Sequence, residues 1–162
     1  MISRDYIPRS EFMRLAIEEA HAARDRGDYA IGAVVVLGET VLASSGNRVK
    51  VDSDPTQHAE VAAIRKACEL QKSRHLEGAV LYTTAEPCPM CAAASIWSRM
   101  SGIVSGSTIQ DMAEFREKFG NPEWTWRTVD IAARAVLESG DPQLFLFEGF
   151  LREECQSLFH DA

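Results

Sequence analysis

The sequence predicts an α/β fold, a three-layer α/β/α sandwich with a central mixed sheet of five strands. Two observations support this class. Short β-branched or apolar runs alternate along the chain with longer segments of helical periodicity. The first two runs are joined by a tight turn, as in an antiparallel hairpin, whereas the later runs are separated by helical segments, which is typical of parallel pairing.

The first half of the chain combines helical periodicity with a β-hairpin. In the first helix, apolar residues recur every three or four positions between a capping serine and a terminating glycine. In the hairpin, β-branched and alternating residues flank the turn. The predicted elements are a helix from Ser10 to Gly27, strands at 31–37 and 40–44, and a helix that follows Asp54-Pro55-Thr56 and runs to about Gln71.

The second half alternates strands and helices and ends in a region of weaker signals. Its predicted elements are a strand at 79–83, a helix at 88–99, a strand at 102–105, helices at 111–119 and 128–138, a strand at 144–147 and a helix from about Leu151. Between the two middle helices, Trp124 and Trp126 lie in a turn. We expect these rings to anchor in the core rather than to stack on a ligand.

Length and composition predict a single domain over residues 1–162 and limit the classes of partner that it can bind. The chain has 162 residues, 46% of them hydrophobic, which is enough for one substantial core. A net charge of -7 argues against a broad nucleic-acid-binding surface and leaves a local one open, since phosphate binding rests on clustered lysine and arginine. Residues 1–9 contain no apolar run, so we expect neither a signal peptide nor a membrane anchor.

The chemistry-bearing residues form two short motifs. His58-Ala59-Glu60 and the pair Cys88 and Cys91 supply one nitrogen and two sulfur ligands. Three protein ligands are the number a catalytic zinc ion needs if its fourth position is to stay open for water. Glu60 lies two residues from His58, where it can exchange protons near the metal without binding it. We therefore predict one zinc ion per chain, with Glu60 as the catalytic acid and base.

Helix starts explain the spacing within both motifs. On an ideal helix His58 and Glu60 would point about 200° apart, so they converge only where a helix is just beginning, as Pro55 indicates. Cys88 and Cys91 are three residues apart at the next helix start, so both sulfurs can reach one ion. A redox Cys-x-x-Cys pair is the alternative, but His58-Ala59-Glu60 argues against it. Of the four cysteines, Cys68 and Cys155 are too few for a disulfide framework, which favours a reducing cytoplasm.

The motifs resemble the cytidine deaminase superfamily, whose signature is His-x-Glu followed by Pro-Cys-x-x-Cys. The resemblance covers roughly residues 10–110, including Gly46-Asn47-Arg48, Asp54-Pro55-Thr56 and Leu81-Tyr82-Thr83. It is strongest to the branch of bacterial nucleobase and tRNA deaminases. It implies the cytidine deaminase-like fold and replacement of an exocyclic amine on a nucleobase ring by a carbonyl, with release of ammonia.

The same resemblance implies a set of substrate contacts. The Asn47 side chain would form hydrogen bonds with the substrate's ring. Backbone groups of Ala59 and of Ala85 or Glu86 would orient the ring and its amine. Trp97 stands where guanine deaminases often carry a tryptophan, so its ring is expected to wall the pocket. Guanine deaminases commonly form oligomers, and the alanine-rich helix around 92–95 permits close helix approach, so the resemblance implies a homodimer or larger assembly.

The substrate is the least determined feature. Trp97 and the acidic composition favour a free purine-like base such as guanine. However, Asp28-Tyr29-Ala30-Ile31-Gly32 stands where the guanine deaminases carry Gly-Gly-Pro-Phe-Gly. The tRNA adenosine deaminases share Asp54-Pro55-Thr56 and a tail like Glu148-Gly149-Phe150-Leu151, which makes adenosine in tRNA the alternative. A cytosine or cytidine deaminase and a catalytically inactive zinc-binding module are further alternatives.

Overall fold

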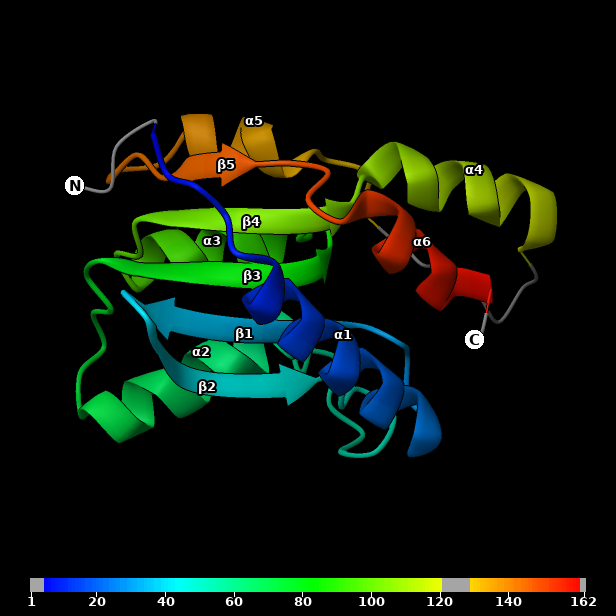
Figure 1. Cartoon of the computed structure of the whole chain (residues 1–162), viewed down its shortest axis with the longest axis horizontal. Coiled ribbons are helices and arrows are strands. Elements are labelled where there is room, and N and C mark those ends of the chain that lie inside the picture. The colour runs from blue at the N-terminus through cyan, green and yellow to red at the C-terminus, as the bar shows by residue number, and fades with distance from the viewer. Residues whose placement is uncertain (1–4, 121–128, 161–162) are drawn as a thin grey trace.

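A five-stranded mixed sheet forms the centre of the structure, a computed structural model in which residues 5–120 and 129–160 are described (Figure 1). The strands are β1 (Gly32–Leu37), β2 (Thr40–Gly46), β3 (Ala79–Ala85), β4 (Gly102–Ser107) and β5 (Phe145–Phe147). Their order is β2-β1-β3-β4-β5. The pairs β1–β2 and β1–β3 are antiparallel, and β3–β4 and β4–β5 are parallel. The predicted mixed sheet and α/β class are thereby confirmed.

Helices cover both faces of this sheet. They are α1 (Ser10–Asp25), α2 (Ala59–Gln71), α3 (Pro89–Trp97), α4 (Ile109–Phe119), α5 (Ala133–Glu138) and α6 (Arg152–His160). Helices α1 and α6 lie on one face, α2, α3 and α5 on the other, and α4 extends beyond the end of β4 (Figure 1). Among the described residues, no helix is both long and apolar enough to cross a membrane.

Alternation along the strands divides the core into two layers. In β1, Ala33 and Val35 face α2 and α3, whereas Val34 and Val36 face α1. Strands β3 and β4 continue both rows, because successive side chains of a strand point to opposite faces of its sheet. The near-continuous apolar sequence of β1 thus reflects burial on both faces.

Glycine allows α1 to lie close to the sheet. A Cβ atom at Gly32 would come within 1.9 Å of the Ala16 carbonyl oxygen, and one at Gly46 within 2.5 Å of the Glu19 carbonyl oxygen. These two glycines face each other across the β1–β2 pair. Their missing side chains let a helix backbone approach the strand ends from which the loops of the candidate site begin.

Most predicted boundaries lie within a few residues of the observed ones. One detail of the first helix is wrong, because Arg9 rather than Ser10 is its N-cap, and no side chain caps it. The helix predicted at 128–138 begins at Ala133, where α5 starts. The predicted turn with Trp124 and Trp126 lies outside the described residues.

Helix α4 is joined to α6 by a buried carboxylate. Thr108 and Asp111 form a capping box at the start of α4, and the Arg152 guanidinium donates to both oxygens of Asp111, at 2.9 and 2.5 Å. The Asp111 side chain is only 2% exposed. Burial opposes its ionisation, but the hydrogen bonds from Arg152 and Thr108 outweigh this and lower the pKa of Asp111 from 3.8 to about 2.

We expect Asp111→Asn to lower the free energy of unfolding at neutral pH by about 1.5–3 kcal/mol, the usual range for hydrogen bonds to a charged group. Since the folded pKa is depressed, this contribution is present above about pH 4 and lost as the pH falls towards 2. Urea unfolding of both proteins across this range should show the difference shrinking. A difference that stays constant with pH would contradict the role assigned to this carboxylate.

Candidate zinc centre

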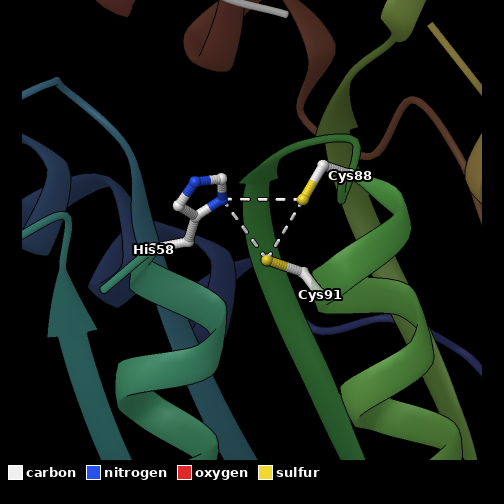
Figure 2. A group of neighbouring side chains, drawn as sticks. All are labelled: His58, Cys88 and Cys91. Atoms are coloured by element: carbon white, nitrogen blue, oxygen red, sulfur yellow. Dashed lines mark hydrogen bonds between the residues drawn. The ribbon is translucent and has the colours of Figure 1, made fainter. Parts of the chain in front are cut away.

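Two helix starts bring the candidate ligands together. His58 is the N-cap of α2 and Cys88 is the N-cap of α3, and both have extended backbone before the helix begins. Cys91 lies in the first turn of α3 and is buried. Figure 2 shows the three side chains pointing towards one another from the two neighbouring helices. The prediction that both motifs stand at helix starts is confirmed.

The three ligand atoms form a nearly equilateral triangle. His58 Nδ1 lies 3.6 Å from Cys88 Sγ and 3.5 Å from Cys91 Sγ, and the sulfurs are 3.6 Å apart. Tetrahedral zinc, with bonds of about 2.3 Å to sulfur and 2.0–2.1 Å to nitrogen, requires ligand separations of roughly 3.5–3.8 Å. These residues therefore fit zinc, and His58, Cys88 and Cys91 form the candidate zinc site.

The acidity of the two thiols also suits a cation. Hydrogen bonding to Cys91 lowers the pKa of Cys88 to about 4, against the effect of burial, with a further contribution from His58. The pKa of Cys91 is raised well above its ordinary value by its hydrogen bond with Cys88 and by burial. One sulfur is thus readily ionised, and placing a second negative charge beside it is costly unless a positive ion lies between them.

Glu60 lies against this cluster in a closed environment. Its side chain is buried at 4% exposure, and burial raises its pKa although the neighbouring His58 opposes the rise. One carboxylate oxygen is 3.6 Å from Cys91 Sγ and the other is 3.0 Å from the Thr83 hydroxyl. Thr83 comes from β3, and its role was not visible in the sequence, where it reads as an ordinary strand residue.

The loop before His58 is fixed by two aspartates. The Asp54 carboxylate accepts from the Thr56 backbone N–H and hydroxyl, at 2.8 and 2.7 Å, which forms the turn that leads into α2. Asp28 is buried and accepts from the backbone N–H groups of Lys50 and Val51, at 2.9 and 3.0 Å. Asp54 stood out in the sequence, whereas the bonds from Asp28 to Lys50 and Val51 span 22 and 23 residues and gave no signal.

The predicted substrate contact Asn47 lies at the end of β2 and is buried. Its side-chain oxygen accepts from the Val49 backbone N–H at 3.0 Å, and its backbone N–H donates to the Ile31 carbonyl. The first bond orients the side-chain amide, and the second holds the backbone. Ala59, the first residue of α2, is buried beside the candidate ligands.

Ala85 and Glu86 lie at the end of β3, before the cysteines. The Ala85 carbonyl accepts from the Thr83 hydroxyl, and the Glu86 N–H donates to the Ser107 carbonyl at 2.8 Å. Of the Glu86 backbone groups, the N–H is therefore already engaged. The Glu86 side chain is also occupied, because its oxygens accept from the N–H groups of Ile109 and Ala133.

Trp97, the last predicted substrate contact, lies at the surface. This residue ends α3 and is 83% exposed, on the outer side of the helix layer. Six residues after Cys91, a rise of about 1.5 Å per residue places it roughly 9 Å farther along the helix axis. Helical spacing thus separates Trp97 from the zinc ligands of its own chain, and its contact with a substrate stays a prediction.

A mixed sheet that carries a histidine and a Cys-x-x-Cys pair on two adjacent helix starts defines a zinc-binding α/β domain. The model of the cytidine and deoxycytidylate deaminase zinc-binding region matches residues 7–107. The chain belongs to this family, and the resemblance seen in the sequence is confirmed.

Named relatives include both tRNA and nucleobase enzymes. The tRNA-specific adenosine deaminase of Agrobacterium fabrum is 48% identical over 99 residues, covering 61% of this chain and 65% of that protein. The guanine deaminase of Bacillus subtilis is 43% identical over 83 residues, 51% of this chain and 53% of that protein. Each match thus spans less than two thirds of the relative.

A solved structure gives a longer match. It comes from a study of A-to-I editing by tRNA:A34 deaminases and superposes with a TM-score of 0.72 and 35% identity. The match covers 93% of this chain and 99% of the other. It therefore extends well beyond the zinc-binding region, into the α4 to α6 part of the fold.

We expect Cys91→Ala to lose bound zinc, because two ligands hold the ion far less tightly than three. Glu60→Gln is the matched control, since it changes an equally buried group that contacts the cluster without supplying a ligand. Elemental analysis of the purified proteins, after dialysis against a weak chelator, provides the comparison. Full zinc content in Cys91→Ala, or loss of zinc in Glu60→Gln, would mean that the ligands are assigned wrongly.

Proposed function

We propose that this protein is a zinc-dependent hydrolytic deaminase that converts adenosine to inosine in tRNA. The reaction type rests on one observation, the buried Glu60 carboxylate beside a three-ligand cluster with zinc-binding geometry. A zinc ion held by His58, Cys88 and Cys91 would supply Lewis-acid activation of a water molecule. The remaining steps are proton transfers and orientation, which fall to residues of this chain.

Glu60 is the proposed proton carrier. Its raised pKa allows it to take a proton from water and return it to a ring nitrogen and to the leaving amine. Thr83 can accompany both states, because its hydroxyl lies 3.0 Å from Glu60 and 3.0 Å from the Ala85 carbonyl. The hydroxyl donates to Glu60 when the carboxylate is charged. It donates to Ala85 and accepts from Glu60 when the acid is protonated.

Asn47 and the start of α2 are the proposed orienting groups. The Asn47 carbonyl is held by Val49, which leaves the amide nitrogen as the donor end for an acceptor on the ring. The first N–H groups of a helix have no partner within the helix, so that of Ala59 is suited to a substrate oxygen or ring nitrogen. The Ala85 or Glu86 carbonyl is the corresponding acceptor for the amine.

The preference for tRNA adenosine reverses the order drawn from composition. It is supported by the longer and more similar matches, 48% identity to a tRNA-specific adenosine deaminase and a structural match over 99% of a chain from a study of tRNA:A34 deaminases. The outward position of Trp97 removes one argument for a guanine pocket. Asp28 stands where guanine deaminases carry glycine, and here it holds the backbone of Lys50 and Val51. This difference also favours tRNA adenosine over guanine.

Deamination of free guanine is the second candidate, favoured by the 43% identity to a guanine deaminase over 83 residues. A cytosine or cytidine substrate uses the same chemistry and belongs in the same assay. An inactive zinc-binding module would have no use for an acid and base beside its metal. The buried position of Glu60 against Cys91 argues against that alternative.

The experiment is an ammonia-release assay on tRNA and on a panel of free guanine, adenine, cytosine and their nucleosides, with inosine detected in digested tRNA. We expect turnover on tRNA that falls steeply with salt, because phosphate contacts release counterions. Glu60→Gln should lose about 10²–10⁴-fold of the rate while keeping zinc, since an amide cannot carry protons.

Other outcomes are equally informative about the substrate. Rapid, salt-insensitive release from guanine with none from tRNA would make guanine the substrate. Near wild-type turnover by Glu60→Gln would remove Glu60 from the mechanism. No release from any substrate by the zinc-loaded protein would favour the inactive module.

A homodimer is the proposed assembly. Helix α3 contains no charged residue, and its outer side borders a largely apolar groove between α2, α3 and α5 that includes Ile64, Ala93, Trp97 and Val136. A largely apolar, uncharged helix with an exposed face is expected to be covered, here by a second copy of the chain.

Trp97→Glu should therefore lower the molar mass measured by light scattering, whereas Ile7→Glu, at an 82% exposed site elsewhere, should not. An unchanged mass in Trp97→Glu would exclude this surface.

We also propose a cytoplasmic location. All four cysteines are free thiols, and the candidate site needs both of its sulfurs reduced. A reducing compartment keeps such a pair available for metal rather than for a disulfide.

A further inference from the structure

We propose that the Glu86 side chain is a positioning residue for the zinc site, which holds the Cys88 ligand by binding the starts of two other helices. The inference concerns the metal ligand and is independent of which base is deaminated. It rests on the path of the chain between β3 and α3, where Glu86 is separated from Cys88 by Pro87 alone.

The Glu86 side chain is buried and bonded to two other helices. Its side chain is buried at 3% exposure, and its oxygens accept from the N–H of Ile109 at 2.7 Å and the N–H of Ala133 at 2.9 Å. These are the first residues of α4 and α5. One carboxylate therefore accepts from N–H groups that have no partner within their own helices, at two helix starts 24 residues apart in sequence.

In the part of the chain that the structure describes, Glu86 is the side chain that accepts from the Ile109 and Ala133 N–H groups, and the caps of the two helices do not replace it. The capping box of α4 uses Thr108 for the Asp111 N–H and Asp111 for the Thr108 N–H, so it does not serve Ile109. The N-cap of α5 is Ala132, which has no side-chain acceptor. A buried N–H left without an acceptor is costly, so both helix starts are held to Glu86.

The same contacts restrain Cys88. Strand β3 ends at Ala85, and α3 begins at Pro89, so residues 86–88 belong to neither element. The Glu86 N–H is fixed by the Ser107 carbonyl, its side chain is fixed by α4 and α5, and the ring of Pro87 limits rotation of the next step. Glu86 thus supplies the fixed point from which Cys88 is directed towards His58.

Glutamine is the informative substitution at this position. It matches the shape of glutamate and can still accept one N–H, but its amide nitrogen would face the other N–H as a second donor. We expect Glu86→Gln to fold and to release zinc to a chelator about 10- to 100-fold faster than wild type, the usual cost of losing an outer support of a metal ligand. Amide exchange should accelerate at Ile109 or Ala133.

Asp111→Asn is the matched control. It removes another buried carboxylate at the start of α4, and it is expected to lower stability, but Asp111 contacts Thr108 and Arg152 rather than the Cys88 segment. Its zinc release should stay at the wild-type rate. If both variants release zinc faster in proportion to their loss of stability, Glu86 is merely structural and the proposal fails.

A measurement on the wild-type protein covers the case in which Glu86→Gln does not fold. Because coupling between two sites is reciprocal, removal of zinc should loosen the Cys88 segment and with it the Glu86 bonds. Amide exchange followed by NMR should then rise at Ile109 and Ala133 more than at Asp111, whose N–H is held by Thr108 alone. Equal changes at the three amides, or none, would overturn the proposal.

Discussion

The convergence of two helix starts at one end of the sheet is the constraint on which the site depends. A ligand within a helix has its direction set by the helical turn, whereas a ligand at the N-cap lies on extended backbone and can point across to a neighbouring helix. His58 and Cys88 both use this position. Displacing either helix start by one residue would turn its ligand by about 100° and open the triangle.

Charge is the second constraint, because the site gathers groups that repel each other without a cation. Two thiols and the buried Glu60 carboxylate lie within hydrogen-bonding distance. Their proximity raises the pKa of Cys91, and burial raises that of Glu60. A divalent ion offsets this repulsion, so the arrangement that suits the proposed proton transfer is also the one that makes metal binding favourable.

The sequence was sufficient to predict which residues gather at the candidate site where this follows from local spacing. His58, Glu60, Cys88 and Cys91 were identified because ligand chemistry and helix starts act over a few residues, and the strands were identified because burial has a short period. Thr83 and Asp28 were missed, since the contacts that matter to the site, from Thr83 to Glu60 and from Asp28 to Lys50, span 23 and 22 residues. The exposure of Trp97 was not predicted, because the sequence gave its helix but not the direction of its ring.

Net charge illustrates a further limit of composition. The total of -7 argued against a nucleic-acid substrate, yet Asp28, Glu60, Glu86 and Asp111 are each at most 6% exposed. These four carboxylates are hydrogen-bonded inside the fold, where they fix loops and helix starts or lie beside the metal site. They are four of the 24 acidic residues, and Asp111 is in addition paired with the Arg152 guanidinium. Counting them as surface charge overstates the repulsion that a phosphate backbone would meet, so the acidic composition is weak evidence against tRNA.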